Sequence, residues 1–436
     1  MYVLPPLDHS RHRIADIHAM RSQNASVLAN LAWWRAEGIS RAQLARESGL
    51  SASTVSAIVS ELLDAGVLNS SHHAPSAGGR PPLVLRFNAE RNHLVGVEVG
   101  ASHLGVAVCD LRARVRWYQA RDFDVPSDPR GTLATVAELV RRARRQREAV
   151  GPLLGLGVAV PCPVDELTPD RLSPRLFPAW IDVRLAAELH ERVGVRVFVD
   201  NDANCGALAE AHVGGAVGVS DFAYIKVATG VGAGHVVEGR PYRGFNGIAG
   251  EIGHTSVDPR GRPCRCGLRG CLEAEIGAGA IVDKARAAMS AGRASSLAER
   301  SPLTLADVVA EARAGDPLAT ELVAEAGRHL GVGVANLLNL MNPGRVIIGG
   351  ALAMAGDLLL TPLRSVVRER ALWTAAERAQ VVISPLGASQ IAVGAAALVL
   401  RAALADLSLF RAPVALAPQA ARPVPRIWKA GGHGHA

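Results

Sequence analysis

The hydrophobic pattern of this 436-residue chain changes near residue 83, and this change limits its fold more than any single motif does. Residues 22–68 show helical spacing broken by short turns, whereas the pattern from Leu83 onward is one of strands interleaved with helices. Ser, His, Gly and Pro fill the stretch between them, residues 70–82. The sequence therefore predicts a small helical module followed by a larger α/β body.

Within the body, two apolar runs at residues 94–99 and 105–108 are joined by a short polar segment, which predicts a hairpin. After residue 410, Ala and Pro predominate, and we expect a flexible tail there. The same patterns predict strands at residues 153–160, 195–200, 219–227, 234–237 and 346–348, and helices at 132–146 and 318–340.

The segment 41–60 fits a helix-turn-helix. Gly49 permits the left-handed backbone of a tight turn, Ala45 is small enough for a close helix crossing, and Val55 and Ile58 share one helical face. Short side chains on the outer face of the second helix suit the major groove. A helical hairpin used only for packing or dimerisation is the alternative. As DNA-contacting residues we predict Arg41, Gln43, Ser51, Ser53, Thr54 and Ser56, with Ser51 also placed to cap the second helix.

A Gly-Gly-Arg-Pro-Pro stretch and a short strand at 83–87 follow the two helices, as expected of a wing. Arg80 is placed to enter a minor groove, where a narrow A·T-rich tract concentrates negative potential. An interdomain linker explains the same residues equally well.

A cluster of sulfur and nitrogen ligands marks the middle of the body. His254, Cys264, Cys266 and Cys271 supply one imidazole and three thiolates, the set for a closed tetrahedral zinc site. Four protein ligands leave no position for water, so such a zinc ion would be structural. Free buried cysteines are the alternative, and core thiols are the favoured interpretation for the chain's other three cysteines.

Polar residues at the end of a predicted strand indicate a ligand site. Asn201 and Asp202 follow the apolar run 195–199, at the strand end where open α/β sheets bind ligands. With Glu251 and Glu273, which flank the cysteine cluster, they offer donors and acceptors suited to a polyhydroxylated molecule. A helix-capping Asp-Asn turn is the alternative, and for Asp200 alone it is the favoured interpretation. Gly-rich turns at 229–234 and 349–350 have the composition of phosphate-binding turns, although Gly serves any tight turn.

Charge is a poor guide to the partner. The net charge of +7 suggests nucleic acid, yet residues 1–92 hold nine Arg against seven acidic residues, so the excess does not mark the helical module. No apolar run approaches the roughly eighteen residues that span a bilayer, and the N-terminus lacks the pattern of a secretory signal. We expect a cytoplasmic protein with no membrane partner.

Taken together, these motifs resemble the ROK family of repressors, open reading frames and sugar kinases, from about residue 24 to about residue 400. The most specific parts are the cysteine cluster, the Gly-Glu-Ile-Gly-His run ending at His254, and Asn201-Asp-Ala-Asn204. The resemblance implies a winged helix-turn-helix at 1–88 and a two-lobed, actin-like (ribonuclease H-like) sugar-binding body at 89–405. Lobe 1 would cover about 89–205 plus 388–405, lobe 2 about 206–387, and the tail 406–436.

The resemblance also implies roles for residues in the cleft. Asp202 matches the general base of the family's kinases, and His254 would bind zinc through one ring nitrogen while its other nitrogen faces the sugar. The kinases' Asp-x-Gly-Gly-Thr-Lys-like phosphate loop is altered here to Glu98-Val-Gly-Ala-Ser-His103, which argues against ATP use because phosphoryl transfer depends on positioning and charge neutralisation. The implied sugar-binding residues are Asn201, Asp202, Glu251, His254 and Glu273.

The expected function is therefore that of a sugar-responsive transcriptional regulator, a repressor of carbohydrate-utilisation genes. It would bind operator DNA as a homodimer or higher homo-oligomer, with a sugar or sugar phosphate as effector and zinc as a structural cofactor. No catalytic residue is expected unless the chain is instead an ATP-dependent sugar kinase with an accessory DNA-binding module, in which case Asp202 would be the base. Constitutive DNA binding with an unused sugar cleft is a third alternative.

Overall fold

The structure is a computed structural model that describes residues 17–71, 83–165, 170–173 and 176–410. Arg80 and the expected wing tip lie outside these ranges, as do residues 411–436. Residues 407–410 form a short 3-10 helix, and Phe410 is buried with its ring against Phe87. The folded chain thus extends beyond residue 406, where the tail was expected to begin.

The N-terminal module is a three-helix winged fold. Its turn at Gly49 has a φ of 71°, and the Ser51 side chain caps the second helix by accepting a hydrogen bond from the backbone N–H of Thr54, both as predicted. Leu44, Val55 and Ile58 are buried in its core. The elements are α1 (Ile17–Trp34), α2 (Arg41–Ser48) and α3 (Ala52–Asp64), with a small sheet of order β1-β3-β2 formed by β1 (Ile39–Ser40), β2 (Leu68–Ser71) and β3 (Val84–Phe87).

The first sheet of the body has the order β6-β5-β4-β7-β8, antiparallel on one side of β4 and parallel on the other. The predicted hairpin is present as the antiparallel pair β4 and β5. Its strands are β4 (His93–Val99), β5 (His103–Asp110), β6 (Val115–Asp122), β7 (Leu153–Val160) and β8 (Val197–Asn201), and α4 (Pro129–Arg144) and α5 (Leu185–Val193) cover its outer face.

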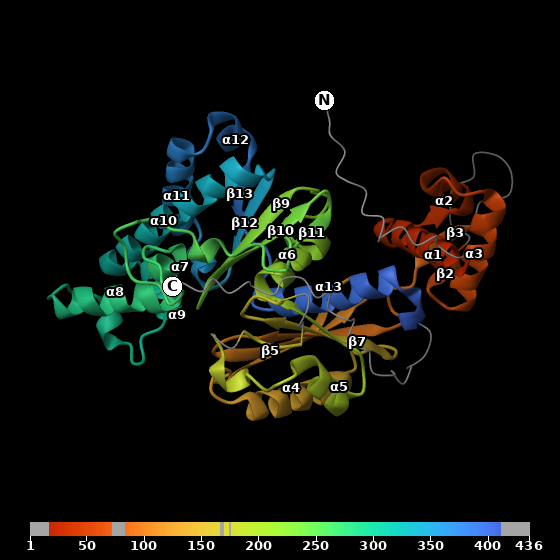
Figure 1. Ribbon diagram of the computed structural model, residues 1–436, viewed down its shortest axis with the longest axis horizontal. Coiled ribbons are helices and arrows are strands. Elements are labelled where there is room, and N and C mark those ends of the chain that lie inside the picture. Colours follow the sequence, from red (N-terminus) through yellow and green to blue (C-terminus); the bar gives the residue numbers. More distant parts are fainter. Residues whose placement is uncertain (1–16, 72–82, 166–169, 174–175, 411–436) are drawn as a thin grey trace, which may run out of the picture.

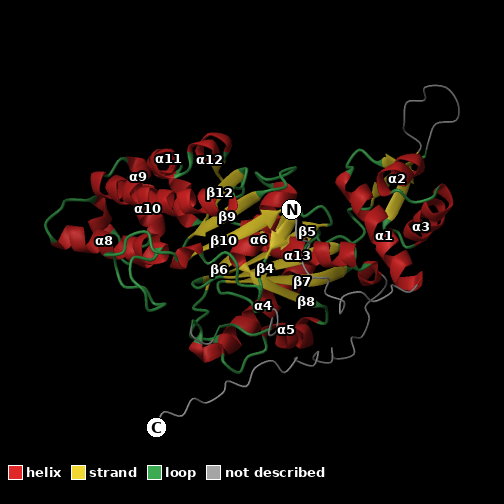
Figure 2. Cartoon of the chain, turned by 45° about the horizontal axis from the view of Figure 1, so that its top comes forward, coloured by secondary structure: helices red, strands yellow, loops and turns green. Residues whose placement is uncertain are grey.

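The second sheet repeats this topology with the order β11-β10-β9-β12-β13. Two sheets with one connectivity give the body its actin-like, two-lobed form (Figure 2). The strands are β9 (Phe222–Val227), β10 (Val231–Val237), β11 (Arg240–Tyr242), β12 (Arg345–Gly349) and β13 (Gln380–Ile383), accompanied by α7 (Leu272–Ile276), α8 (Ala278–Ser290), α9 (Leu305–Ala314), α10 (Pro317–Met341), α11 (Asp357–Arg370) and α12 (Trp373–Arg378).

Two helices, α6 (Asp202–Val213) and α13 (Gln390–Ala405), lie between the sheets. Helix α13 packs directly on the first sheet because Gly96 and Gly157 have no side chain; a Cβ at either would stand 1.8 Å from a backbone oxygen of α13. Helix α6 packs on the second sheet in the same way, at Gly234. Because α6 runs unbroken to Val213, it crosses the lobe boundary expected near residue 205.

The module docks on the body through α1, which lies beside the C-terminal end of α13 (Figure 1). Ser26 donates to the carbonyl of Ala405, and the indole N–H of Trp33 donates to the carbonyl of Leu111 at 2.7 Å. One continuous apolar core joins the module to α13. None of the helices in the described ranges has the length and apolar character that crossing a membrane requires.

Candidate functional site

A cavity of about 600 Å³ opens between the two sheets, and we call it the cleft. It lies at the carboxyl ends of β4, β8, β9 and β12, the side of such sheets on which ligands bind. All five predicted sugar-binding residues line this one cavity although they come from separate segments: Asn201, Asp202, Glu251, His254 and Glu273.

Asn201 and Asp202 stand where β8 passes into α6. The Asn201 side-chain oxygen caps α6 by accepting from the backbone N–H of Ala203 and of Asn204, and its amide donates to the carbonyl of Cys162. Its polar atoms are therefore already engaged in the fold. Asp202, 9% exposed, turns its carboxylate toward the cleft.

Asp200, just before this pair, has a structural role. Its carboxylate accepts from both terminal nitrogens of Arg243, at 2.7 and 2.5 Å, and from the side-chain amide of Asn204. These bonds tie the end of β8 to the loop after β11. The helix-capping alternative thus fits Asn201, the N-cap of α6, whereas Asp200 is held by Arg243 and Asp202 remains turned to the cleft.

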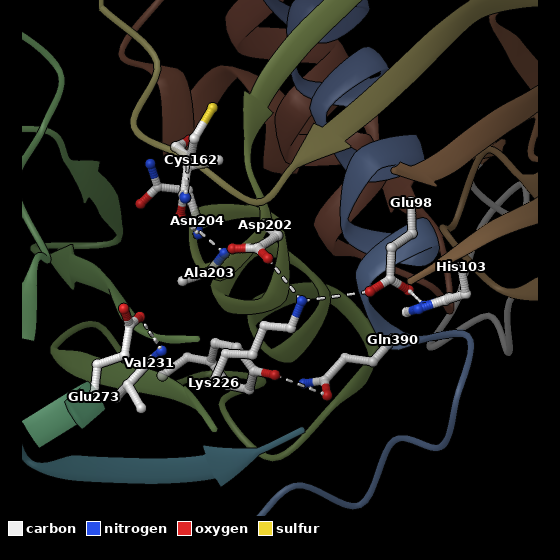
Figure 3. Close-up of polar contacts among 12 residues, drawn as sticks. Glu98, His103, Cys162, Asp202, Ala203, Asn204, Lys226, Val231, Glu273 and Gln390 are labelled. Carbon is white, nitrogen blue, oxygen red and sulfur yellow. Dashed lines mark hydrogen bonds and ion pairs between the residues drawn. The ribbon is translucent and has the colours of Figure 1, made fainter. Parts of the chain in front are cut away.

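A buried ion-pair network crosses the cleft (Figure 3). The Lys226 ammonium of β9 lies 2.7 Å from Asp202 Oδ2 and 3.4 Å from Glu98 Oε1 of β4, and His103 Nε2 lies 3.4 Å from the other Glu98 oxygen. Burial opposes ionisation of Glu98, but Lys226 and His103 lower its pKa below the ordinary value. Burial likewise opposes the charge on Lys226, and the two carboxylates raise its pKa above the usual range.

Glu251 and Glu273 form another part of the cleft wall. Glu273 accepts from the backbone N–H of Val231 at 3.0 Å and pairs with Arg265 Nε at 2.9 Å. Burial, followed by the Glu273 and Asp202 charges, raises the pKa of Glu251 to about 7. A carboxyl group with that pKa is able to donate or accept a hydrogen bond near neutral pH, which suits recognition of a hydroxyl.

The four predicted metal ligands converge beside this wall, with all their ligand atoms within 4.8 Å of one another. The Cys264 sulfur is 3.6 Å from His254 Nδ1, and the Cys266 and Cys271 sulfurs are 3.6 Å apart. Tetrahedral zinc, with bonds of about 2.3 Å to sulfur and about 2.0 Å to nitrogen, holds its ligand atoms about 3.6 Å apart. The donor set and its spacing fit zinc, and the other ring nitrogen of His254 lies 3.9 Å from Glu251.

The segment 98–103, which resembles an altered kinase phosphate loop, contributes to the lining of the cleft, and the His103 ring packs against Gly100. The His103 ring lies so close to Gly100 that a Cβ there would be 2.7 Å from His103 Cε1. The Glu98 carboxylate lies at the start of the loop and would meet an incoming phosphate as a like charge.

The face of the module that is predicted to contact DNA is exposed to solvent along α3. Ser53 and Ser56 on α3 are exposed, whereas Arg41 is partly buried. Gln43 is committed to the α2 capping box with Ser40, and the Ser51 and Thr54 hydroxyl groups lie 2.8 Å apart in the α3 cap. Several predicted contact residues therefore also shape the helix-turn-helix.

Lys226 and Arg265 were not predicted from the sequence. Lys226 is one of three lysines among 47 basic residues and interrupts an apolar strand, a signal that was available. No sequence signal marked His212, which ends α6 with its ring centroid 5.3 Å from that of Trp33 on α1. That contact exists only once the module docks on the body.

Comparison with known families agrees with this geometry. The ROK family model matches residues 94–402, and a winged helix-turn-helix DNA-binding model matches residues 34–69. Among curated relatives, the xylose repressor of Bacillus subtilis (strain 168) is 29% identical over 83% of this chain and 91% of its own length. The N-acetylglucosamine repressor of Escherichia coli O6:H1 is 32% identical over 85% of this chain and 91% of its own length.

Solved structures give the same picture. A ROK family transcriptional regulator described as a homologue of the Escherichia coli MLC protein covers 90% of this chain and 100% of its own, with a TM-score of 0.76 and 28% identity. A ROK family glucokinase from Streptomyces griseus, in complex with glucose and AMPPNP, covers 70% of this chain and 98% of its own, with a TM-score of 0.60 and 28% identity. The chain therefore belongs to the ROK family and carries a winged helix-turn-helix DNA-binding module ahead of the family domain.

Proposed function

We propose that this protein is a sugar-responsive transcriptional regulator, a repressor of carbohydrate-utilisation genes. The observation that carries the proposal is the course of α6, which begins at Asp202 in the cleft and carries His212 in its last turn, against Trp33 of the DNA-binding module. A sugar with different affinities for open and closed arrangements of the sheets would shift that helix, and with it the module. The similarity to repressors along most of the chain supports this proposal.

Operator DNA is the proposed partner of α3. The exposed Ser53 and Ser56 present short side chains to a major groove, with the backbone of the turn held by the Ser51 cap. A homodimer would place two such helices on successive half-sites, and a partner of this kind implies a cytoplasmic location. The remaining proposed contacts are Arg41, Gln43, Thr54 and Arg80.

The proposed effector is a sugar held in the cleft. Asp202, Glu251 and Glu273 offer carboxyl oxygens to its hydroxyl groups. The Asn201 side-chain amide, which donates to the carbonyl of Cys162, holds the backbone next to Asp202 in place. The ring nitrogen of His254 that is not a proposed zinc ligand lies 3.9 Å from Glu251, and His254 lines the same cleft. This set of acceptors and donors suits a ligand with several hydroxyl groups.

Zinc is the proposed cofactor. His254 Nδ1 and the thiolates of Cys264, Cys266 and Cys271 would hold it, and the ion would supply structural cross-linking of the loop rather than reactivity, because four protein ligands fill its coordination shell. The same loop bears Arg265, which pairs with Glu273 in the cleft. Loss of the cluster would therefore disturb the wall that receives the sugar.

A sugar kinase is the second candidate, favoured by the position of Asp202 in the cleft and by the similarity to a glucokinase. Against it, the like charge of Glu98 and the His103 ring over Gly100 disfavour the nucleotide. We therefore propose that the protein binds sugar without phosphorylating it.

Selection of DNA from a random-sequence pool tests DNA binding. We expect the wild type to enrich a two-fold symmetric site, and Ser56→Glu to lose it, because a carboxylate on the exposed face of α3 repels phosphates. Ala287→Glu, an equally exposed change on α8 of the body, is the matched control and should retain the site. Enrichment of no sequence by the wild type, or an undiminished site in Ser56→Glu, would contradict the proposal.

A further inference from the structure

Lys226 is the least expected charged group of the body. It lies on the central strand β9, its side chain is 12% exposed, and its neighbours on that strand are apolar. Its ammonium group, which comes from the second sheet, pairs with two carboxylates at strand ends of the first sheet, Glu98 on β4 and Asp202 directly after β8. Burying a lysine is costly unless its charge is paired, and here two carboxylates pair it.

The geometry leaves part of this ammonium group for a ligand. A lysine has three N–H donors, and within the described part of the chain the two carboxylates account for two of them. Both Lys226 and Asp202 line the cleft. A sugar hydroxyl both donates and accepts, so one hydroxyl is able to donate to Asp202 while it accepts from Lys226.

The lysine and the arginine that line the cleft are both paired with carboxylates. Lys226 pairs with Asp202 and Glu98, and Arg265 pairs with Glu273. In the Gly-rich turn at 229–234, whose composition is that of a phosphate-binding turn, the backbone N–H of Val231 also donates to Glu273. A phosphate group that accepted a hydrogen bond from either side chain would lie beside the carboxylates already paired with it, as a like charge.

We propose that Lys226 is a specificity-determining residue that contacts the same sugar hydroxyl as Asp202, and that the cleft it shapes selects a neutral sugar over the corresponding sugar phosphate. This inference rests on the proposed function, since it concerns the sugar site of the regulator. It adds a recognition residue to the predicted set and narrows the effector from a sugar or sugar phosphate to an unphosphorylated sugar.

Isothermal titration calorimetry on the full-length, zinc-loaded protein tests the selectivity. The probes are D-xylose, D-glucose, N-acetylglucosamine, and the 6-phosphates of the last two. At least one neutral sugar should bind, and any 6-phosphate should bind at least tenfold more weakly than its parent. A 6-phosphate that binds as tightly as its parent, or more tightly, would overturn the inference while leaving a sugar-binding regulator intact. Heat from none of the five would contradict the proposed function itself, and the inference would fall with it.

The role of Lys226 is tested with Lys226→Met, which keeps the length of the side chain without its charge. We expect sugar affinity to fall at least tenfold, as for loss of a charge-assisted hydrogen bond. Lys284→Met is a close control, because Lys284 makes a similar pair of contacts, 2.7 Å to Glu325 and 3.4 Å to Glu275, away from the cleft. It should bind sugar as the wild type does.

A second variant separates recognition from support of the fold. In Lys226→Met, the carboxylates of Glu98 and Asp202 face each other without a cation, which by itself is destabilising. Combining it with Glu98→Gln removes that repulsion. If Lys226 contacts the sugar, the double variant recovers thermal stability but stays at least tenfold weaker in sugar binding. Recovery of wild-type affinity in the double variant, or unchanged affinity in Lys226→Met, would show that Lys226 only supports the fold and would overturn the proposal.

Discussion

The imidazole of His212 and the indole of Trp33 lie with ring centroids 5.3 Å apart, and they join the last turn of α6 to the first helix of the DNA-binding module. Trp34 stacks on the same imidazole at 6.5 Å. The other end of α6 is the Asp202 turn in the cleft, about 18 Å away for a helix of this length. A single helix thus touches both the proposed sugar site and the proposed DNA reader.

This contact predicts that His212→Ala uncouples the two sites. We expect sugar affinity to stay near the wild-type value, while the sugar-induced change in DNA affinity falls at least fivefold, because α6 no longer bears on Trp33. Fluorescence anisotropy with labelled operator DNA, with and without sugar, measures both quantities. His329→Ala, on α10, is the control and should leave the response unchanged; an unchanged response in His212→Ala would exclude α6 as the link.

The same residue predicts a dependence of stability on pH. Burial, with the positive charge of Arg401, lowers the pKa of His212 to about 4, whereas an unfolded histidine titrates near 6.5. Between these values the unfolded chain binds more protons, so the contribution of His212 is complete above pH 6.5 and is lost as the pH falls toward 4.

Urea unfolding at pH 7, 6 and 5 measures this effect. The free energy of unfolding of the wild type should decrease as the pH is lowered from 7 to 5, and that of His212→Gln should decrease less. Burial also lowers the pKa of His93 and His235, so the variant should keep part of the slope. Equal slopes for the two proteins would contradict the assignment of a neutral, enclosed His212.

The cysteine cluster predicts one bound zinc per chain. Changing both Cys264 and Cys266 to Ser should remove the metal and abolish the response to sugar, since the loop also positions Arg265 against Glu273. Elemental analysis gives the zinc content, and calorimetry gives the affinity for the sugar, on which the response depends. Cys109→Ala, which changes a buried thiol of the first sheet, should keep the metal. A double Ser variant that responds to sugar like the wild type would contradict the proposed role of zinc in the sugar response.

Absence of kinase turnover is a separate prediction. With ATP, Mg²⁺ and the neutral sugars, ADP release should not exceed that of a sugar-free control, because the Glu98 carboxylate and the His103 ring lie in the segment that resembles an altered kinase phosphate loop. A coupled enzyme assay measures ADP. Sugar-dependent turnover that disappears in Asp202→Asn would establish the kinase instead.

Much of the fold was predictable from local pattern. Gly49 and Ser51 fixed the turn and cap of the helix-turn-helix, because left-handed backbone and capping depend on a few neighbouring residues. The buried strands and the long helix α10 were visible in hydrophobic spacing. The clustering of His254, Cys264, Cys266 and Cys271 was visible for the same reason, since they lie in one short segment with matching chemistry.

Contacts between distant segments were not predictable in this way. Nothing local indicates that Lys226 meets both Glu98, 128 residues before it, and Asp202, 24 residues before it. The capping role of Asn201 and the contact of His212 with Trp33 depend on how the two sheets and the module come together. These tertiary contacts decide which polar groups remain for a ligand, so the chemistry of the cleft required the structure.

The most direct test of the account is the dissociation constant of the full-length protein for its selected operator, measured by fluorescence anisotropy with and without a saturating sugar that calorimetry has shown to bind. We predict that the sugar changes this constant at least tenfold, and that Asp202→Asn, which weakens sugar binding at the start of α6, shifts the response to higher sugar concentrations. A sugar that binds the cleft yet leaves the operator dissociation constant within twofold of its sugar-free value would contradict the proposal that the protein is a sugar-responsive regulator.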